Sequence, residues 1–322
     1  MDPTALGVDV GGTKILVGIV TQDGEVVETR RYPMECTNQA RTLNSIETAL
    51  ADFMSAWAGS APLAMGVGLV GQTNPSAGMW VRAMNLPIHS PVPLVRLLRK
   101  QAGLPAVLDN DVHAATLAEL RWGIGKETKD FIYLNIGTGL AAGLVCNGQL
   151  VRGAANYAGE LGHMIVDPGG ILCACGQRGC LEPIASGGGI LAQVRAGLRD
   201  HPDSVLFEPA KEGVLSASQV FQAAESGDRL ASRITGKAVQ ALSTALTNLV
   251  NILNPAAIIY GGGVVSDGWL MGKVNEFVSA NALVAARRSL KGIWPSRLNP
   301  DQVGLLGAAS LAWNYLEKKE LV

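Results

Sequence analysis

The sequence lacks an excess of charge of either sign. Its 322 residues include 26 lysines and arginines against 27 aspartates and glutamates, which leaves a net charge of −1. Proteins that bind nucleic acid present clustered basic side chains to the phosphates, and neither a basic cluster nor an acidic tail is present here. We therefore expect no nucleic acid partner.

Long apolar runs are also lacking. Glycine, aspartate, lysine or arginine interrupts each apolar run before it reaches the roughly 20 residues that a membrane-spanning helix needs. The first residues, MDPTALGVDVGG, contain neither the basic n-region nor the apolar h-region of a secretion signal. We expect a cytoplasmic protein with no membrane partner.

Cysteine is scarce, at five residues in the whole chain. An odd count in a long chain without an export signal argues against a framework of disulfides and leaves the thiols free to bind metal. Hydrophobic residues, by contrast, make up 48% of the sequence, so the chain can bury a sizeable core. Its length exceeds that of one typical domain and favours two.

A strand, a glycine turn and a second strand open the chain. Residues 5–10 (ALGVDV) run into GGTK, and residues 15–20 (ILVGIV) follow. The same arrangement returns as DFIYLNI, GTG and LAAGLVC over residues 130–146. In each case a strand with a polar residue near its end enters a Gly/Thr turn, so the chain looks internally duplicated.

Strands and helices alternate along the rest of the chain. Buried strands are predicted at residues 62–70, 105–111 and 256–264. Helices are predicted at residues 38–57, 93–102, 112–123, 186–200, 216–226, 228–253 and 303–319. This alternation favours an α/β architecture in two halves, in which ligands bind beyond the carboxyl ends of the strands.

Three glycine turns follow apolar strands, and each is a candidate for binding phosphate. Successive backbone N–H groups in such turns form a concavity that suits anionic oxygens. None of the three fits the Walker pattern GxxxxGK[ST] or GxGxxG between strand and helix, so a different nucleotide fold is implied. They are Gly11-Gly12-Thr13, Gly137-Thr138-Gly139 and Gly261-Gly262-Gly263.

Soft metal ligands are concentrated in one short stretch. His163, Cys173, Cys175 and Cys180 supply three thiolates and an imidazole, which is a complete tetrahedral set for a structural Zn²⁺. The alternative is that small cysteines merely pack in a glycine-rich loop. Glu160 and Glu182 flank the ligands, so a bound ion would fix both acids at one wall of a cleft. The alternative is that the two acids are a solvated pair of carboxylates near the metal loop.

Asp109-Asn110-Asp111 stands between a predicted strand and a predicted helix. Residues of these types often simply cap a helix. A carboxylate in this position can also orient a hydroxyl and accept its proton during phosphoryl transfer. From the residues alone, both interpretations stay open.

The order of the motifs carries a resemblance to a known family. DVGGTK, LDND, GTG, AGELGHM, CACGQRGCLE and YGGGV follow one another from Asp9 onward, and GLLGAA lies in the last predicted helix. In this order they resemble the ROK family of sugar kinases (repressors, open reading frames, kinases), and most closely its ATP-dependent glucokinases. The resemblance implies a duplicated, two-domain α/β fold of the actin-like (ribonuclease H-like) class. Its N-terminal domain would comprise residues 1–112 and 302–322, and its C-terminal domain, with the zinc loop, residues 113–301.

The resemblance also implies roles for individual residues. Asp111 would be the general base, Asp9 would hold Mg²⁺ on the phosphates of ATP, and His163 would contact both sugar and metal. The implied sugar-binding residues are Asn85, Asn110, Asp111, Glu160, His163 and Glu182. The implied nucleotide-binding residues are Asp9, Gly11, Gly12, Thr13, Lys14, Gly137, Thr138, Gly139, Gly261, Gly262 and Gly263. Asn85 has an alternative as an ordinary turn asparagine.

The chain departs from the family pattern at two of these motifs. The family usually shows NDxNA, whereas His113 stands here in place of the second asparagine, and we expect a histidine without a catalytic role. The second phosphate turn is followed by Leu140-Ala141-Ala142 in place of a glycine run. The added methyl groups either narrow the approach of the phosphates or simply pack.

The expected reaction is ATP-dependent phosphorylation of a hexose, with glucose and its 6-hydroxyl favoured. The alternatives are an N-acetylhexosamine kinase, acting on N-acetylglucosamine or N-acetylmannosamine, a fructokinase and a non-catalytic sugar sensor. Some N-acetylmannosamine kinases lack the glutamate of ExGH, so Glu160 favours a hexose. Repressors of the family carry a DNA-binding domain before the first glycine turn, where this sequence has eight residues before Asp9. The family likeness also implies a homodimer or a tetramer.

Overall fold

The computed structural model describes residues 2–84 and 86–320, and the chain forms two compact units. Unit 1 comprises residues 1–127, 152–158 and 297–322, and unit 2 comprises residues 128–151 and 159–296. Residues 113–127, 152–158 and 297–301, which the sequence placed in the C-terminal domain, therefore lie in unit 1. The first of these stretches belongs there because it continues a helix that packs against the C-terminal helix of the chain.

Unit 1 is built on a five-stranded sheet in the order β3-β2-β1-β4-β7. Its strands are β1 (Thr4–Val10), β2 (Lys14–Thr21), β3 (Val26–Pro33), β4 (Met65–Leu69) and β7 (Ala106–Asn110). The first three form an antiparallel meander, whereas β1, β4 and β7 are parallel. A small hairpin of β5 (Gln72–Asn74) and β6 (Met79–Arg82) follows β4. Because β1, β4 and β7 are parallel, their carboxyl ends meet at one edge of the sheet.

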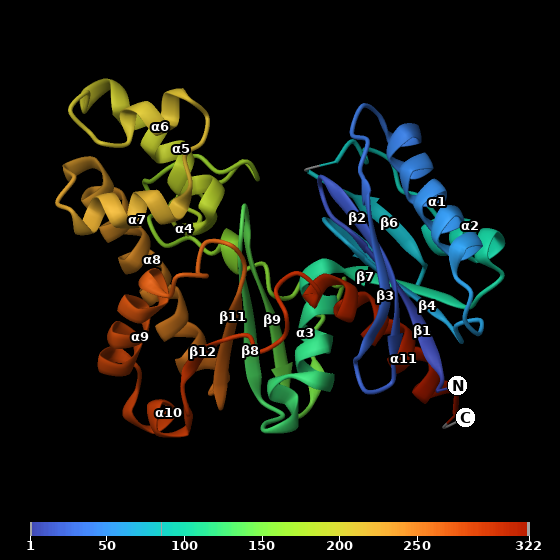
Figure 1. The fold of residues 1–322 in the computed structure, drawn as a ribbon. Helices are drawn as coiled ribbons and strands as arrows, with labels where there is room; N and C mark the ends of the chain where they lie inside the picture. Colours follow the sequence, from blue (N-terminus) through green and yellow to red (C-terminus); the bar gives the residue numbers. More distant parts are fainter. Residues whose placement is uncertain (1, 85, 321–322) are drawn as a thin grey trace. The chain divides into compact units, whose positions relative to one another are not determined.

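Helices cover both faces of the unit 1 sheet (Figure 1). On one face, α1 (Gln39–Ala56) and α2 (Leu94–Ala102) share an apolar core with Leu6 and Val8 of β1. On the other face lie α3 (Asp111–Trp122), which continues into the short η1 (Ile124–Lys126), and α11 (Val303–Glu320). The sheet is therefore the middle of three layers.

Glycines on the second face bring α11 close to the strands. A methyl group on Gly7 of β1 would lie 2.8 Å from the carbonyl oxygen of Leu305, and one on Gly66 of β4 would overlap the carbonyl of Ala308. Leu6, Val8, Met65 and Val67, which alternate with these glycines, point into the opposite core. The α11 backbone therefore packs directly on strand backbone, with only hydrogen atoms between them at these points.

Unit 2 repeats this sheet in the order β10-β9-β8-β11-β12. Its strands are β8 (Phe131–Ile136), β9 (Leu140–Cys146), β10 (Gln149–Leu150), β11 (Ala257–Gly261) and β12 (Ile293–Pro295). Again the first three are antiparallel, and β8, β11 and β12 are parallel. The same order and the same strand directions in both units confirm the internal duplication inferred from the sequence.

The helices of unit 2 surround α8 (Arg229–Leu253), whose residues Leu242, Ala245 and Leu246 are completely buried. They share one large apolar core with β8 and β11. The remaining helical segments are η2 (Leu161–His163), α4 (Glu182–Ala185), α5 (Gly187–Gly197), η3 (Leu198–Asp200), α6 (Phe207–Lys211), α7 (Ala217–Glu225), α9 (Trp269–Asn281) and α10 (Val284–Ser289).

The long predicted helices match the structure within a few residues, and local capping explains their ends. Asp228 accepts from the backbone of Ala231 and begins α8, whereas Asn254 ends it in the left-handed conformation. Ser216 and Gln219 form a reciprocal capping box at α7. Within the described residues, no helix combines the length and the apolar character needed to cross a bilayer.

The close packing of α11 predicts a stability effect. In Gly66→Ala the new methyl meets the α11 backbone, and we expect the free energy of unfolding to fall by about 1–3 kcal/mol. Gly236→Ala is the control, because a methyl there has nothing within 4 Å and replaces a glycine inside α8. Urea unfolding checks both variants, and an unchanged midpoint in Gly66→Ala would contradict the packing argument.

Candidate active site

Two acids of unit 1 lie in one row of the sheet. Asp9 of β1, Gly68 of β4 and Asp109 of β7 are in register, and the paired strands are parallel. Side chains at paired positions leave the same face of a sheet. Gly68 therefore leaves the space between the two carboxylates free of a side chain.

Asp9 lies against the start of α11. A methyl on Gly304 would overlap its carboxylate, so glycine is needed there. Burial raises the pKa of Asp9 to about 6, and the ammonium of Lys14 partly offsets this rise. A bound cation would favour the ionised form. Its place at a strand end suits a carboxylate that holds Mg²⁺ beside a phosphate, either directly or through water.

Asn110 caps α3, as the simpler interpretation of the sequence predicted. Its Oδ1 accepts from the backbone N–H groups of Val112 at 2.9 Å and His113 at 3.3 Å. Its Nδ2 donates to the carbonyl of Gly71 at 3.0 Å. An amide carries two N–H groups, so with respect to residues 2–84 and 86–320 one N–H of Asn110 is left for a ligand.

Asp111 is the first residue of α3, and its Oδ1 accepts from the N–H of Val112 at 3.0 Å. Burial, together with the negative charge of Asp9, raises the pKa of Asp111 to about 7. A carboxylate that holds a proton near neutral pH is matched to general-base chemistry at that pH. Two neighbouring acids whose pKa values are both raised are also typical of functional sites.

The first glycine turn joins β1 to β2. The N–H of Gly11 donates to the carbonyl of Lys14 at 3.0 Å and closes the turn, whereas a methyl on Gly12 would meet nothing within 4 Å. The side chain of Thr13 is exposed. The tip of the turn is therefore open to solvent, and an anionic ligand could reach it.

The second glycine turn joins β8 to β9 in unit 2, and the start of α5 donates hydrogen bonds to its backbone. The N–H of Gly187 donates to the carbonyl of Gly137 at 2.8 Å, and that of Gly188 donates to Thr138 at 3.1 Å. The exposed side chain of Thr138 lies at the tip. Of the two alanines that follow, Ala142 is 2% exposed and packs in the core of unit 2. At residue 142, the methyl group that a glycine would lack therefore packs in the core of unit 2.

Glu182 binds the second glycine turn directly. Its Oε2 accepts from the N–H of Leu140 at 3.0 Å, and a methyl on Gly139 would lie 2.9 Å from the same oxygen. Glu182 is also the first residue of α4 and follows the last cysteine of the cluster after Leu181. One acid therefore links the cysteine loop to the turn that is expected to hold phosphate.

The third glycine turn lies beside the second in unit 2, because β11 pairs with β8. Gly262 has a φ of +102°, and a methyl there would overlap the carbonyl of Ile136. The N–H of Val264 donates to that same carbonyl at 3.2 Å. Glycine is thus required at 262, and the turn packs on the end of β8, next to Gly137.

The four soft ligands come together in unit 2. The ligand atoms of His163, Cys173, Cys175 and Cys180 all lie within 4.8 Å of one another. The Sγ atoms of Cys175 and Cys180 are 3.7 Å apart, as are the Sγ of Cys173 and the Nδ1 of His163. Sulfur atoms bound to Zn²⁺ at about 2.3 Å in a tetrahedron lie about 3.8 Å apart. The donor set and its spacing therefore fit Zn²⁺.

His163 faces two ways. Its Nδ1 belongs to the ligand cluster, and its Nε2 lies 3.8 Å from Oε2 of Glu160. The backbone reinforces this arrangement, because the N–H of His163 donates to the carbonyl of Glu160 at 3.0 Å. A metal on Nδ1 would fix the ring and hold Nε2 and Glu160 on the same side.

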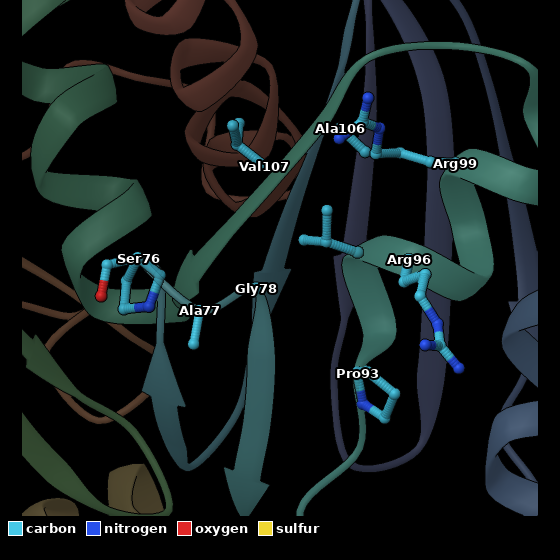
Figure 2. A pocket seen from close by; sticks show the side chains of 10 residues that line it. Ser76, Ala77, Gly78, Pro93, Arg96, Arg99, Ala106 and Val107 are labelled. Carbon is cyan, nitrogen blue, oxygen red and sulfur yellow. The ribbon is translucent and has the colours of Figure 1, made fainter.

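A groove of about 400 Å³ in unit 1 lies between α2 and the β5–β6 turn. Ser76, Gly78, Arg96, Arg99 and Val107 are among its lining residues, and none of the predicted site residues is. Figure 2 shows the two arginines projecting in different directions, so they do not converge on one ligand. We do not assign the active site to this groove.

Comparison with known proteins identifies the family. The model described as the ROK family matches residues 5–314. The chain belongs to the ROK family. This membership confirms both the resemblance and the actin-like α/β fold class predicted from the sequence.

Named ROK relatives cover nearly the whole chain. A glucokinase of Halalkalibacterium halodurans is 35% identical over 287 residues, which is 86% of each chain. An N-acetylmannosamine kinase of Vibrio vulnificus is 31% identical over 280 residues, 87% of this chain and 89% of that one. The crystal structure of a ROK family glucokinase from Streptomyces griseus, in complex with glucose and AMPPNP, has a TM-score of 0.74 at 29% identity. It covers 97% of this chain and 99% of its own.

The ROK site residues predicted from the sequence fall into two groups, one in each unit. Unit 1 brings together Asp9, Asp111 and the turn Gly11-Gly12-Thr13, whereas unit 2 brings Glu182 to the second turn and Glu160 to His163. Asn85 lies outside the described residues. The roles of all these residues remain proposals, taken up below.

The sequence predicted no role for Asp109, which is completely buried and binds several side chains. Its Oδ1 accepts from Nδ2 of Asn156 at 3.0 Å, and its Oδ2 accepts from Nη1 of Arg152. His113, expected to have no catalytic role, places Nδ1 3.3 Å from Oδ1 of Asp109. More than 40 residues separate Asp109 from Arg152 in the chain, and no spacing rule connects them.

The cysteine cluster predicts a metal content. The purified protein should carry about one zinc ion per chain, because a closed set of three thiolates and one imidazole binds Zn²⁺ tightly at pH 7. Cys175→Ser should lower the zinc content and the melting temperature of unit 2, as measured by elemental analysis and calorimetry. Cys146→Ser is the control, since Cys146 lies outside the cluster. Equal zinc contents in the two variants would exclude this site.

Proposed function

We propose that this chain is an ATP-dependent hexose kinase that phosphorylates glucose at its 6-hydroxyl. Membership of the ROK family and the glucokinase relatives support the reaction class. The observation that carries the mechanism is the position of Asp111 at the start of α3, directly after the end of β7 and near enough to Asp9 for that acid to raise its pKa. No zinc is needed for the transfer step itself, because a closed tetrahedral site leaves no open position for a substrate.

Asp111 is the base. The 6-hydroxyl donates a hydrogen bond to its carboxylate, which orients the oxygen toward the γ-phosphorus. The carboxylate takes the proton as the new P–O bond forms, while the bond between the γ-phosphorus and the β–γ bridging oxygen breaks and ADP leaves. Asn110 contributes its remaining N–H to a neighbouring sugar oxygen. Because Asn110 caps α3 and also binds Gly71, its amide is held in one orientation before sugar binds.

Unit 1 also supplies charge for the phosphates. Asp9 would hold Mg²⁺, which neutralises phosphate charge when bound, and Lys14 would add a second cation. The N–H groups and the hydroxyl of Gly11-Gly12-Thr13 would bind phosphate oxygens. In unit 2 the turn Gly137-Thr138-Gly139 would do the same, and Gly261-Gly262-Gly263 beside it would border the adenosine. Backbone donors of this kind are fixed before the reaction and need no reorganisation.

Unit 2 would bind the sugar through Glu160, His163 and Glu182. A structural Zn²⁺ on the cysteines and Nδ1 of His163 would hold these side chains in place. Glu182 also binds the N–H of Leu140, so the sugar site and the second phosphate turn share one carboxylate. A sugar hydroxyl bound to Glu182 would therefore lie next to the turn that receives the phosphates.

A second candidate is N-acetylmannosamine kinase, which the relative from Vibrio vulnificus supports. The carboxylate of Glu160 beside His163 favours a hexose with free hydroxyls, because a carboxylate accepts hydrogen bonds from hydroxyls and an acetamido group is bulkier than the hydroxyl that it replaces. The cytoplasmic location and the homodimer expected from the sequence remain predictions.

A sugar panel tests the proposed reaction. In a coupled assay of ADP release, kcat/KM should be highest for glucose and about 100-fold lower for N-acetylmannosamine and N-acetylglucosamine, since these place an acetamido group where hydroxyls are bound. Mannose, fructose and allose complete the panel. A preference for an acetylated sugar would replace glucose by the second candidate, and absence of ADP release with every sugar would leave a non-catalytic sugar sensor.

Substitution of Asp111 tests the base. Asp111→Ala should keep measurable glucose binding by calorimetry and lower kcat by about 100-fold or more. In the wild type, kcat/KM should rise with pH through about 7, because the base must first lose its proton. Asp228→Asn, which alters the acid that caps α8 in unit 2, is the control and should retain activity. Unimpaired turnover in Asp111→Ala would remove this residue from the mechanism.

The same pKa predicts a stability effect of opposite sign to the activity effect. The folded state binds the Asp111 proton more tightly than the unfolded chain, where the pKa is near the ordinary value of 3.8. Between 3.8 and about 7, the contribution of this group to stability therefore falls as pH rises. Asp111→Asn removes that loss, so at pH 8 and without ligands it should melt at a higher temperature than the wild type. A lower melting temperature would contradict this assignment.

A further inference from the structure

A short connector joins β3 to α1 within unit 1. It comprises residues 34–38, between Pro33 at the end of the strand and Gln39 at the start of the helix. The connector belongs to no helix or strand. It nevertheless makes specific contacts with two parts of unit 1, the first glycine turn on one side and α1 on the other.

The connector donates to two carbonyl groups of the first glycine turn. The N–H of Met34 donates to the carbonyl oxygen of Thr13 at 3.2 Å and extends the β2–β3 ladder by one residue. The Sγ of Cys36 lies 3.2 Å from the carbonyl oxygen of Gly12, to which its S–H donates. The connector therefore binds the turn by its carbonyl groups and leaves the N–H groups of these peptides to face elsewhere.

The contact with Cys36 fixes the direction of one N–H of the turn. The carbonyl of Gly12 and the N–H of Thr13 belong to the same trans peptide, so they point in opposite directions. While the thiol of Cys36 binds the carbonyl, the N–H of Thr13 points away from the connector. Among the residues that the structure describes, none accepts a hydrogen bond from this N–H. It is therefore left for a ligand.

Helix α1 anchors the connector through both backbone polar groups of Glu35. The Oγ1 of Thr42 donates to the carbonyl oxygen of Glu35 at 2.9 Å, and the Oγ of Ser45 accepts from the N–H of Glu35 at 3.2 Å. Thr42 is completely buried, and α1 packs in the core of unit 1 through Ile46 and Phe53. The core therefore sets the position of the residue next to Cys36.

The glycines of the turn explain why such contacts matter. The backbone of glycine is the least restricted of any residue, and Gly11 and Gly12 stand side by side here. If the peptide between Gly12 and Thr13 turned over, its carbonyl oxygen would face an anionic ligand in place of its N–H. Two oxygens with negative charge repel each other, so that orientation would weaken phosphate binding.

We propose that Thr42 and Cys36 are positioning residues for the phosphates of ATP: Thr42 fixes the connector, and Cys36 binds the carbonyl of Gly12 so that the N–H of Thr13 faces the phosphate. This inference rests on the proposed function, because it concerns the phosphate-binding role of the first glycine turn. Neither residue needs to touch the nucleotide. They act within unit 1 and reduce the order that the turn has to acquire on binding.

Nucleotide binding by a Thr42→Val variant tests the proposal. Valine keeps the branched shape of threonine but lacks the hydroxyl, so the connector loses a bond to α1. In calorimetry with Mg²⁺ and glucose present, the Kd of AMPPNP should rise about fivefold, which is within the range expected for one hydrogen bond. The Kd of adenosine, which has no phosphates, should stay within about twofold of wild type. Thr42→Ser keeps a hydroxyl and should recover most of the loss.

Further variants separate positioning from general loss of stability. Cys36→Ala changes an exposed residue, so it should fold and raise the Kd of AMPPNP about twofold, because a thiol is a weak donor. Cys36→Ser still donates and should bind AMPPNP as the wild type does. Thr235→Val is the matched control, because Thr235 is also buried and its Oγ1 donates at 2.9 Å to the carbonyl of Ala231 in α8. It should leave the Kd of AMPPNP unchanged.

An unchanged Kd of AMPPNP in both Thr42→Val and Cys36→Ala overturns the proposal. An equal rise for adenosine also overturns it, because the effect would then not concern the phosphates, and so does an equal rise in Thr235→Val. A wild type that binds AMPPNP but phosphorylates no hexose would overturn the proposed function alone, since binding still tests the positioning role. Absence of AMPPNP binding by the wild type would overturn both.

Discussion

Parallel pairing of β1, β4 and β7 is the constraint on which the chemistry of unit 1 depends. It brings Asp9 and Asp109 into one row with a glycine between them and ends β7 immediately before Asp111. The pKa values of Asp9, Asp109 and Asp111 then shift in different directions. Asp109 is compensated by Arg152 and His113 and stays ionised. Asp9 and Asp111 are half-buried, Lys14 offsets the burial of Asp9 only in part, and the pKa of each is raised. A cation beside Asp9 would therefore stabilise an arrangement that the protein alone leaves electrostatically unsatisfied.

Unit 2 has the same sheet, but different groups lie at the ends of its strands. Asn135 of β8 stands where β1 has Asp9, and it pairs with Gly261, the end of β11. Backbone N–H groups of two adjacent glycine turns replace carboxylates at this edge. The carboxylate of Glu182 also lies at this edge, where it accepts a hydrogen bond from the N–H of Leu140. Under the proposed function, one strand pattern thus provides carboxylates together with a glycine turn in unit 1 and two adjacent glycine turns in unit 2.

Much of this could be read from the sequence, and the exceptions have physical causes. The strand-turn-strand pattern, the capped helices and the cysteine spacing are local signals, so α8, the glycine turns and the ligand cluster were predictable. The short elements β12 and α10 carry too few residues for a periodic signal. Asp109 looked like part of a helix cap, because its partners Arg152 and Asn156 come from an irregular segment far along the chain. Long-range compensation of a buried charge leaves no trace in local patterns.

The seating of α11 on Gly7 and Gly66 has a consequence for biosynthesis. Both strands are translated before unit 2, but the helix that covers them is translated after it. Until then only α3 can cover this side of the nascent sheet, and Gly7 and Gly66 expose bare peptide backbone. Contacts this distant in the chain are slow to form and leave intermediates open to aggregation. A premature stop codon or a frayed tail near residue 303 would thus disable the half of the molecule encoded first.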